Sequence, residues 1–301
     1  MSNKEKYQLS ILIPVYNHVC KGLVENLHLQ AETEGLLYEI IVADDGSTDI
    51  AVKEKNSRIS TIKNCRYISR DVNVGRAAIR NFLAEQSRFK NLLFLDCDIE
   101  LPDSHFLKRY IDADIKAVLY GGVCTEGTHS LGKHNIRYIY EHSSEPHHTA
   151  LERSKQPYKS FRTTNFIISR NIMLAHPFDE RFKHYGYEDV FFGKELKHNN
   201  ITIMHIDNPV SIRDFEPNDV FISKTEEALR TLYCFRNELA DYSKMLESIR
   251  RMEKFIPMEF FRMWHRVFGK LELKNLKGNS PRLTIFNMYR LGYYLSLKDV
   301  K

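Results

Sequence analysis

The feature that most constrains the fold is an alternation of short apolar runs with helix-length segments through the first 125 residues. Branched and aromatic residues gather in the short runs, which predicts β-strands. Strands are expected over residues 9–16, 38–44, 65–70, 91–96 and 117–122. Helices are expected between them over residues 22–34, 50–60 and 76–88. Strand–helix–strand order is typical of an α/β fold, with a mostly parallel central sheet flanked by helices.

Polar side chains follow four of these strands at their carboxyl ends. They fall at residues 17–18, 44–47, 71–75 and 96–98. In open α/β sheets, ligands bind beyond the carboxyl ends of the strands. We therefore expect the four groups to form a single site.

The second half of the chain is less regular. Residues 127–160 show no clear period and are expected to form a flexible insertion or a loop on the acceptor side. Strands are expected at residues 163–170 and 201–206, and helices after residue 223, with breaks at Pro257 and at residues 278–281. This organisation predicts a catalytic domain over residues 1–222, with halves of about 1–125 and 126–222, and a helical C-terminal extension over 223–301.

Charge and cysteine content exclude several classes of protein. Forty-four basic and 39 acidic residues give a formal charge of +5, which is too small to indicate a nucleic-acid partner. The five cysteines are scattered without a CxxC pair, which argues against disulfides or structural zinc and for a reducing compartment. No signal core and no run of about 18 apolar residues is present. A cytoplasmic protein without a spanning helix is expected, and contact with a membrane surface stays open.

The stretch LLFLDCDIELP ends an apolar run with Asp96 and Asp98. In an extended chain these two carboxylates point to the same side while Cys97 points away. Two carboxylates side by side repel each other unless a cation lies between them. Two carboxylates suit Mg²⁺ or Mn²⁺, which also accepts oxygens from a substrate diphosphate. The alternative is a solvated turn, which Asp also favours.

Two other segments carry candidate binding residues. In VADDGSTD, Asp44 or Asp45 could accept hydrogen bonds from a base or a ribose, or could serve only the turn and the helix cap. In RDVNVGRAAIRN, Gly75 is expected at a strand-to-helix turn. Arg76 and Arg80 follow on one helix face, where they would meet a diphosphate or form an exposed basic surface.

Candidate catalytic and metal-binding side chains occur further along the chain. Glu188 and Asp189 in HYGYEDVFFGKEL are either a helix N-terminal acid pair or the source of a general base. Adjacent acids diverge on a helix, so at most one can be that base. His205 closes an expected strand and is either a metal ligand or a buried histidine with satisfied hydrogen bonds.

In this order, the segments resemble family 2 glycosyltransferases with a GT-A fold, the nucleotide-diphospho-sugar transferase fold. The resemblance extends from about residue 9 to residue 216. The segments are ILIPVYN (11–17), IIVADDGSTD (40–49), NVGRAAIRN (73–81), LFLDCDIELP (93–102), TTNFIISRNIM (163–173), FDERF (178–182) and GYEDVFFGKEL (186–196).

The resemblance implies transfer of a sugar from a nucleotide-diphosphate donor, most often a UDP-sugar, to an acceptor hydroxyl with inversion. It implies Mn²⁺ or Mg²⁺ as the cofactor, bound by Asp96 and Asp98, with Asp98 the direct ligand. It implies Asp189 as the catalytic base, with Glu188 near the acceptor. The nucleotide and its diphosphate are then expected to contact Pro14, Tyr16, Asn17, Asp44, Asp45, Asn73, Gly75, Arg76, Arg80 and Asp96.

The sequence departs from this pattern at one place. Relatives with the IDNPV stretch (206–210) often carry a metal-binding His just after it, whereas here Ser211, Ile212 and Arg213 follow. Three consequences of the missing His stay open. The protein could bind the metal weakly, His205 or water could complete the metal shell, or Arg213 could contact the diphosphate.

Residues 252–278 lie outside the resemblance and combine aromatic and basic side chains. A helix of this kind either rests on a membrane surface, near a lipid-linked acceptor, or packs over the catalytic domain. The working hypothesis is a cytoplasmic enzyme, free or peripheral at the inner membrane face, that builds a surface polysaccharide or similar glycan. The alternatives are a metal-dependent nucleotidyltransferase and a non-catalytic nucleotide- or sugar-binding module.

Overall fold

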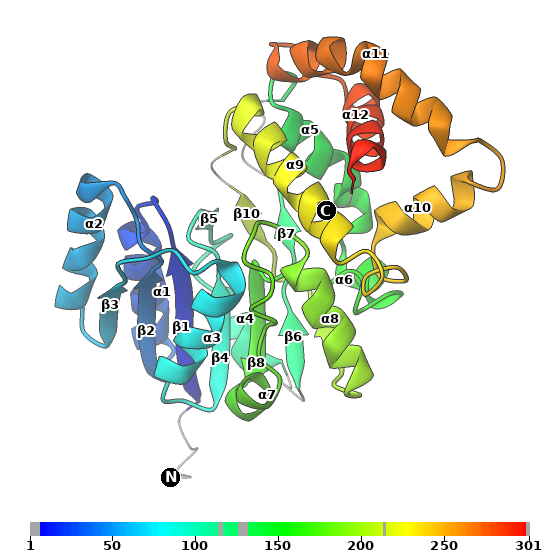
Figure 1. Ribbon diagram of the computed structural model, residues 1–301. Coiled ribbons are helices and arrows are strands. Elements are labelled where there is room, and N and C mark those ends of the chain that lie inside the picture. The colour runs from blue at the N-terminus through cyan, green and yellow to red at the C-terminus, as the bar shows by residue number, and fades with distance from the viewer. Residues whose placement is uncertain (1–6, 114–116, 126–131, 213–214, 299–301) are drawn as a thin grey trace.

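The computed structural model describes residues 7–113, 117–125, 132–212 and 215–298. Within them, a seven-stranded sheet has the order β3-β2-β1-β4-β8-β6-β9 (Figure 1). Its strands are β1 (Gln8–Val15), β2 (Leu37–Asp44), β3 (Cys65–Ser69), β4 (Asn91–Leu95), β6 (Val118–Tyr120), β8 (Asn165–Ser169) and β9 (Ile203–His205). Strands β3, β2, β1 and β4 run parallel, as do β6 and β9, while β8 is antiparallel to both β4 and β6. The expected mostly parallel sheet is confirmed.

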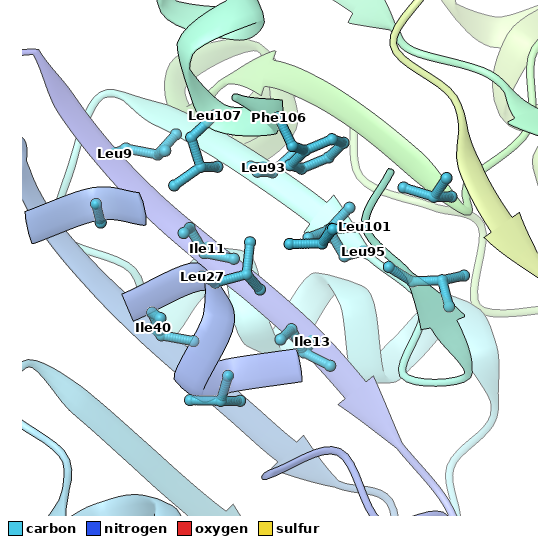
Figure 2. Close-up of a cluster of buried hydrophobic side chains, with 14 of the residues drawn as sticks. Leu9, Ile11, Ile13, Leu27, Ile40, Leu93, Leu95, Leu101, Phe106 and Leu107 are labelled. Carbon is cyan, nitrogen blue, oxygen red and sulfur yellow. The ribbon is translucent and has the colours of Figure 1, made fainter. Parts of the chain in front are cut away.

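One face of the sheet is covered by α1 (Lys21–Thr33) and α4 (Phe106–Asp112). Alternate residues of β1 point to this face, as the period of a strand requires. Figure 2 shows Leu9, Ile11 and Ile13 beside Leu27 of α1 and Phe106 of α4, and all five side chains are buried.

The other face of the sheet is covered by α3 (Arg76–Gln86), α7 (Arg170–Ala175) and α8 (Glu188–His198). Leu12 of β1 points this way and belongs to the same buried cluster as Leu83 of α3 and Phe192 of α8. Helices therefore cover both faces of the sheet, and the polar groups gather at the carboxyl ends of its strands.

A second sheet of three short strands positions the loop after β4. Its order is β5 (Ile99–Glu100), β10 (Val210–Ile212) and β7 (Val123–Cys124). Because β5 begins directly after Asp98, residues 96–98 form a turn between two sheets and are not part of a strand. The predicted strand over 91–96 therefore ends one residue early, at Leu95.

The prediction of a flexible insertion or loop over residues 127–160 is wrong for residues 132–160, which the structure describes. Residues 132–160 contain α5 (Ile136–Ser144), a 3₁₀ turn (Glu145–His147) and α6 (Ala150–Ser154). Asn135 caps α5 by accepting from the Tyr138 amide at 2.9 Å. Thr149 likewise caps α6. Helix α6 has only five residues, and α5 has nine, with Ile136 and Tyr138 buried, so each is too short for a clear hydrophobic period in the sequence.

The C-terminal region forms α9 (Asn218–Cys234), α10 (Lys244–Met252), α11 (Met258–Lys277) and α12 (Leu283–Ser296). The predicted breaks at Pro257 and at residues 278–281 are observed, and a further break separates α9 from α10. Figure 1 shows these helices gathered with α5 beyond one side of the sheet. The boundary expected after residue 222 lies inside α9, so the division into domains stays a proposal. In the described residues, no helix is both long enough and apolar enough to cross a membrane.

Candidate active site

The polar strand ends meet in one cavity of about 890 Å³. It lies between the carboxyl ends of β1 and β4, the start of α3 and α8, and side chains from α5 and α9. Most of the residues predicted from the sequence line it: Pro14, Tyr16, Asn17, Asp45, Asn73, Gly75, Arg76, Arg80, Asp96, Asp98, Glu188 and Asp189. Asp44 and His205 do not. Arg213 lies outside the described residues.

Asn17 fixes the end of β1 against the turn that follows β2. Its backbone has a positive φ of 50°, and its amide donates to Ser47 Oγ at 2.7 Å. Its side-chain oxygen accepts from the Thr48 and Asp49 amides at 2.8 and 3.0 Å. The neighbouring Tyr16 remains 47% exposed at the cavity edge. Asn17 therefore shapes the wall, and Tyr16 offers a free aromatic surface.

Asp44 belongs to the fold and does not face the cavity. It is fully buried, accepts from the Ser47 amide at 2.7 Å and forms a short hydrogen bond with the Tyr67 hydroxyl. Both of its oxygens thus have protein partners. This arrangement matches the turn-and-cap alternative for this residue.

Asp45 joins the β2 turn to the loop before α3. It accepts from the Val74 amide at 2.9 Å and the Gly75 amide at 3.0 Å. Burial raises the pKa of Asp45 above its usual value. Gly75 has a φ of +91°, and a Cβ there would lie 2.7 Å from the Lys183 carbonyl oxygen. The loop therefore needs glycine at this position on two counts.

Two arginines and two acids form an ion-pair network at the centre of the cavity. Arg80, only 1% exposed, places Nη2 2.6 Å from Asp96 Oδ1. Arg76 places Nη2 3.3 Å from Asp96 Oδ2 and Nε 2.8 Å from Glu188 Oε1. Burial alone would raise the pKa of Asp96, but the two arginines hold it below its usual value. Asp96 is therefore ionised and already neutralised by protein cations.

Asp98 has different surroundings, although it lines the same cavity. Across the described ranges, its carboxylate has neither a hydrogen-bond nor an ion-pair partner. Nor do those ranges contain a cluster of three or more His, Cys, Asp or Glu side chains suited to a metal ion. Mg²⁺ in enzymes is often held by one or two carboxylates together with substrate phosphates. The residues present fit such a site, with Asp98 as the available carboxylate.

His205 lies on β9, away from this cavity. Arg153 Nε donates to His205 Nδ1 at 3.2 Å, and His205 Nε2 donates to the Pro157 carbonyl at 3.0 Å. Its ring packs edge-on against Tyr120. Burial lowers the pKa of His205 to about 4, so the ring is neutral. Both ring nitrogens therefore have hydrogen-bond partners within the protein, which matches the second alternative for this residue, a histidine with satisfied hydrogen bonds.

Asp189, like Asp98, lines the cavity without an ion-pair partner among the residues that the structure describes. It sits in the first turn of α8, where Oδ1 accepts from the Val190 amide at 2.8 Å. Burial, and then the negative charge of Glu188, raise the pKa of Asp189 to about 6. A carboxylate with a pKa near neutrality is suited to accept a proton at neutral pH. Glu188, by contrast, is tied to Arg76.

Sequence reasoning missed a second charged group in the cavity. Arg137 of α5 forms a short ion pair with Glu216, and Lys224 of α9 lies 3.1 Å from the same carboxylate. The Tyr185 ring lies 5.3 Å from the Arg76 guanidinium and 5.8 Å from Lys224. Arg137 was not predicted because it lies in the segment expected to be a loop. The one local signal was Asn135, a typical helix N-cap just before it.

The family model of glycosyl transferase family 2 matches residues 10–176, more than half of the chain. The chain belongs to glycosyltransferase family 2. Among curated relatives of this family 2 glycosyltransferase is the teichoic acid poly(glycerol phosphate) polymerase of Staphylococcus epidermidis. It is 26% identical over 56% of this chain and 23% of its own length. The chondroitin synthase of Pasteurella multocida is 27% identical over 62% of this chain and 23% of its own. This chain thus spans about a quarter of each of these relatives.

Solved structures agree on the fold of the family 2 glycosyltransferase. A mannosyltransferase of Pyrobaculum calidifontis, in complex with GDP-Man and Mn²⁺, aligns over 99% of this chain and 89% of its own at a TM-score of 0.58 and 10% identity. TarS of S. aureus in complex with UDP aligns over 96% and 90% at a TM-score of 0.52 and 17% identity. The fold is the GT-A fold expected from the sequence.

Proposed function

We propose that this glycosyltransferase transfers a sugar from a nucleotide-diphosphate donor, a UDP-sugar, to an acceptor hydroxyl with inversion. The observation that carries the proposal is Asp189, whose pKa is raised to about 6. It lines the same cavity as Asp96, which is paired with two arginines, and Asp98, which has no partner among the described residues. A general base, a cation site and a polar wall for a nucleotide are the parts that such a transfer requires.

The donor is placed in the half of the cavity formed by β1, β2 and α3. Tyr16 offers an exposed ring to the base, and Pro14 and Asn17 complete the wall beside it. Asp45 keeps acceptor capacity for a ribose hydroxyl, because a carboxylate has about four lone-pair sites and two amides occupy part of them. Two structural neighbours were solved with UDP or GDP-Man, which supports a nucleotide as the ligand.

The diphosphate is placed between Asp98 and the cations of the cavity. Mn²⁺ or Mg²⁺ would be held by Asp98 together with donor oxygens, where it would act as a Lewis acid that neutralises the leaving group. Asp96 contributes differently, because it orients Arg76 and Arg80. Arg137 and Lys224 add positive charge on the far wall.

Asp189 removes the proton from the acceptor hydroxyl as its oxygen attacks the anomeric carbon of the donor. The bond from that carbon to the diphosphate oxygen breaks in the same step. The nucleoside diphosphate leaves with the electron pair, and Asp189 keeps the proton until solvent removes it. One displacement inverts the anomeric configuration. Glu188 holds Arg76 beside the reacting atoms.

The acceptor is proposed to be a glycan or a lipid-linked glycan, and the sugar a hexose or an N-acetylhexosamine. The two curated relatives carry the names of polymer-forming enzymes, a teichoic acid polymerase and a chondroitin synthase. Those names support a role in surface polysaccharide synthesis.

Thermal unfolding with a panel of nucleotides and nucleotide sugars tests the donor site, with Mn²⁺, with Mg²⁺ and with EDTA. A ligand that binds only the folded state, present at about 100 times its Kd, raises the free energy of unfolding by about 2.7 kcal/mol. We expect UDP or a UDP-sugar to raise the midpoint only with metal, and Asp98→Ala to abolish the effect. If no nucleotide raises the midpoint under any condition, the donor site is wrong and a non-catalytic module becomes the better account.

A further inference from the structure

The exposed face of α11 carries a continuous row of large apolar side chains, which we call the α11 stripe. It consists of Phe260, Met263, Trp264, Val267, Phe268 and Leu271, all at least 36% exposed. Their spacing of three and four residues places them on one side of the helix. The opposite side, with Phe261 and Leu276, is buried against neighbouring helices. The stripe is therefore not the core-facing side of α11.

The apolar surface continues before the helix begins. Phe255 is 84% exposed and Ile256 41% exposed in the connection between α10 and α11. Figure 1 shows α11 as an outer helix of the C-terminal group, with that connection projecting at the edge of the molecule. Monomeric proteins rarely leave a contiguous apolar surface of this kind without a partner.

A basic row borders the α11 stripe. Arg262, Arg266, Lys270 and Lys274 follow one another at four-residue spacing. Arg262 lies 2.5 Å from Glu259, while the other three have no ion-pair partner among the residues that the structure describes. The remaining acid of α11, Glu272, is buried. The border of the stripe therefore carries uncompensated positive charge.

We propose that the α11 stripe docks on an anionic lipid bilayer, with α11 lying in the plane of the interface. Aromatic and aliphatic side chains on one face and Lys or Arg beside them are the composition of an interfacial helix. The basic row complements anionic headgroups, each basic residue contributing attraction near the surface. A second copy of the chain fits less well, because it would bring another basic row to the same contact without acids to balance it.

The proposal goes beyond the transfer reaction and does not depend on it. Trp264 is the one tryptophan of the chain and belongs to the stripe, so its emission reports directly on contact. The full chain is titrated with vesicles of phosphatidylcholine alone and of phosphatidylcholine with phosphatidylglycerol. We expect a shift of Trp264 emission to shorter wavelength and co-sedimentation with the anionic vesicles, both weakened by salt. Neither readout requires turnover, so the two proposals fail separately.

Two double variants separate the apolar and the charged contributions. Val267→Glu with Leu271→Glu should abolish vesicle binding. Arg266→Gln with Lys270→Gln should weaken binding to anionic vesicles by roughly fivefold per residue. Leu29→Glu with Ile50→Glu, at residues 66% and 81% exposed elsewhere on the molecule, adds the same charge and should leave binding unchanged. All six side chains are exposed, and unchanged circular dichroism confirms that each variant folds.

Three results would overturn the proposal. One is the absence of both the emission shift and co-sedimentation with anionic vesicles. Another is an equal loss of binding in the control variant. The third is a lipid-independent emission shift that follows protein concentration and dimer formation and is lost in the Val267→Glu, Leu271→Glu variant. That last result would assign the stripe to a second copy of the chain.

Discussion

Glu188 and Asp189 are neighbours in the sequence, yet they differ in what surrounds their carboxylates. Glu188 contacts Arg76, whereas Asp189 accepts a hydrogen bond only from the Val190 backbone amide among the described residues and lies close to the negative charge of Glu188. Consecutive side chains on a helix point about 100° apart, which lets one acid join the ion pairs and the other face the cavity. The sequence predicted that at most one of the two could be a base, and the contacts favour Asp189.

The raised pKa of Asp189 predicts the pH dependence of transfer. Asp189 must be ionised to accept a proton, so kcat/KM should rise with pH through an acid limb near pH 6. A pH profile measured with saturating metal checks this expectation. An acid limb near pH 4, the usual range of an aspartate, would contradict it.

The same shift predicts a pH-dependent effect on stability. A carboxyl whose pKa is raised in the folded protein favours the folded state when protonated, so its ionisation lowers stability as the pH rises through about 6. Asp189→Asn should therefore raise the free energy of unfolding at pH 7.5, by about 3 kcal/mol at most. The gain should vanish at pH 4. Urea unfolding at both pH values measures it, and a loss of stability at pH 7.5 would contradict the environment described for Asp189.

Arg80 is predicted to be the most sensitive member of the ion-pair network. Arg80→Met leaves buried Asp96 and Glu188 with Arg76 alone, which should cost about 3–5 kcal/mol. Arg58→Met removes an exposed pair with Glu54 and should cost less than about 1 kcal/mol. Urea unfolding of both variants compares them. Equal losses would mean that the network does not depend on Arg80.

At the scale of elements, the loop before α3 should depend on its glycine. Gly75→Ala forces a positive φ on alanine and a Cβ 2.7 Å from a carbonyl oxygen, so we expect a loss of about 1–3 kcal/mol and weaker donor binding. Gly22→Ala, in α1 with no atom within 4 Å of the added Cβ, should instead raise stability by about 0.5 kcal/mol. Thermal unfolding of the Gly75→Ala and Gly22→Ala variants measures both effects. A neutral Gly75→Ala would show that the loop relaxes freely.

The sequence was most informative where elements follow a strong local period. The buried strands are observed within about two residues of their predicted ends, since period and branched residues define them. The antiparallel direction of β8 was not predicted, because a single strand carries no mark of its direction. Helices α5 and α6 were missed because both are short and begin at capping residues, and α5 packs against distant residues such as Phe286. Because α5 was not predicted, Arg137 was not predicted as a cavity residue. Most of the other charged residues around Asp96 and Asp189, and Gly75, were predicted from the sequence.

At the scale of the whole molecule, distant parts of the chain build one cavity. Its donor side comes from the first 100 residues, while Arg137, Glu216 and Lys224 come from later segments near the C-terminal helices. Phe182 and Phe191, which flank the Asp189 segment, share a buried cluster with Leu232 of α9 and Ile249 of α10. The C-terminal helices therefore support the catalytic side directly, and α11 keeps an outer face for another partner.

If Asp189 is the base of the sugar transfer, Asp189→Asn should remove transfer and leave donor binding intact. With a donor identified by thermal unfolding, transfer and donor binding are measured on the same preparation. Asp112→Asn, at an exposed surface pair with Lys108, is the matched control. We expect Asp189→Asn to lose at least about a hundredfold in transfer rate while its donor-induced midpoint shift equals that of the wild type. Transfer at the wild-type rate would mean that Asp189 is not the base.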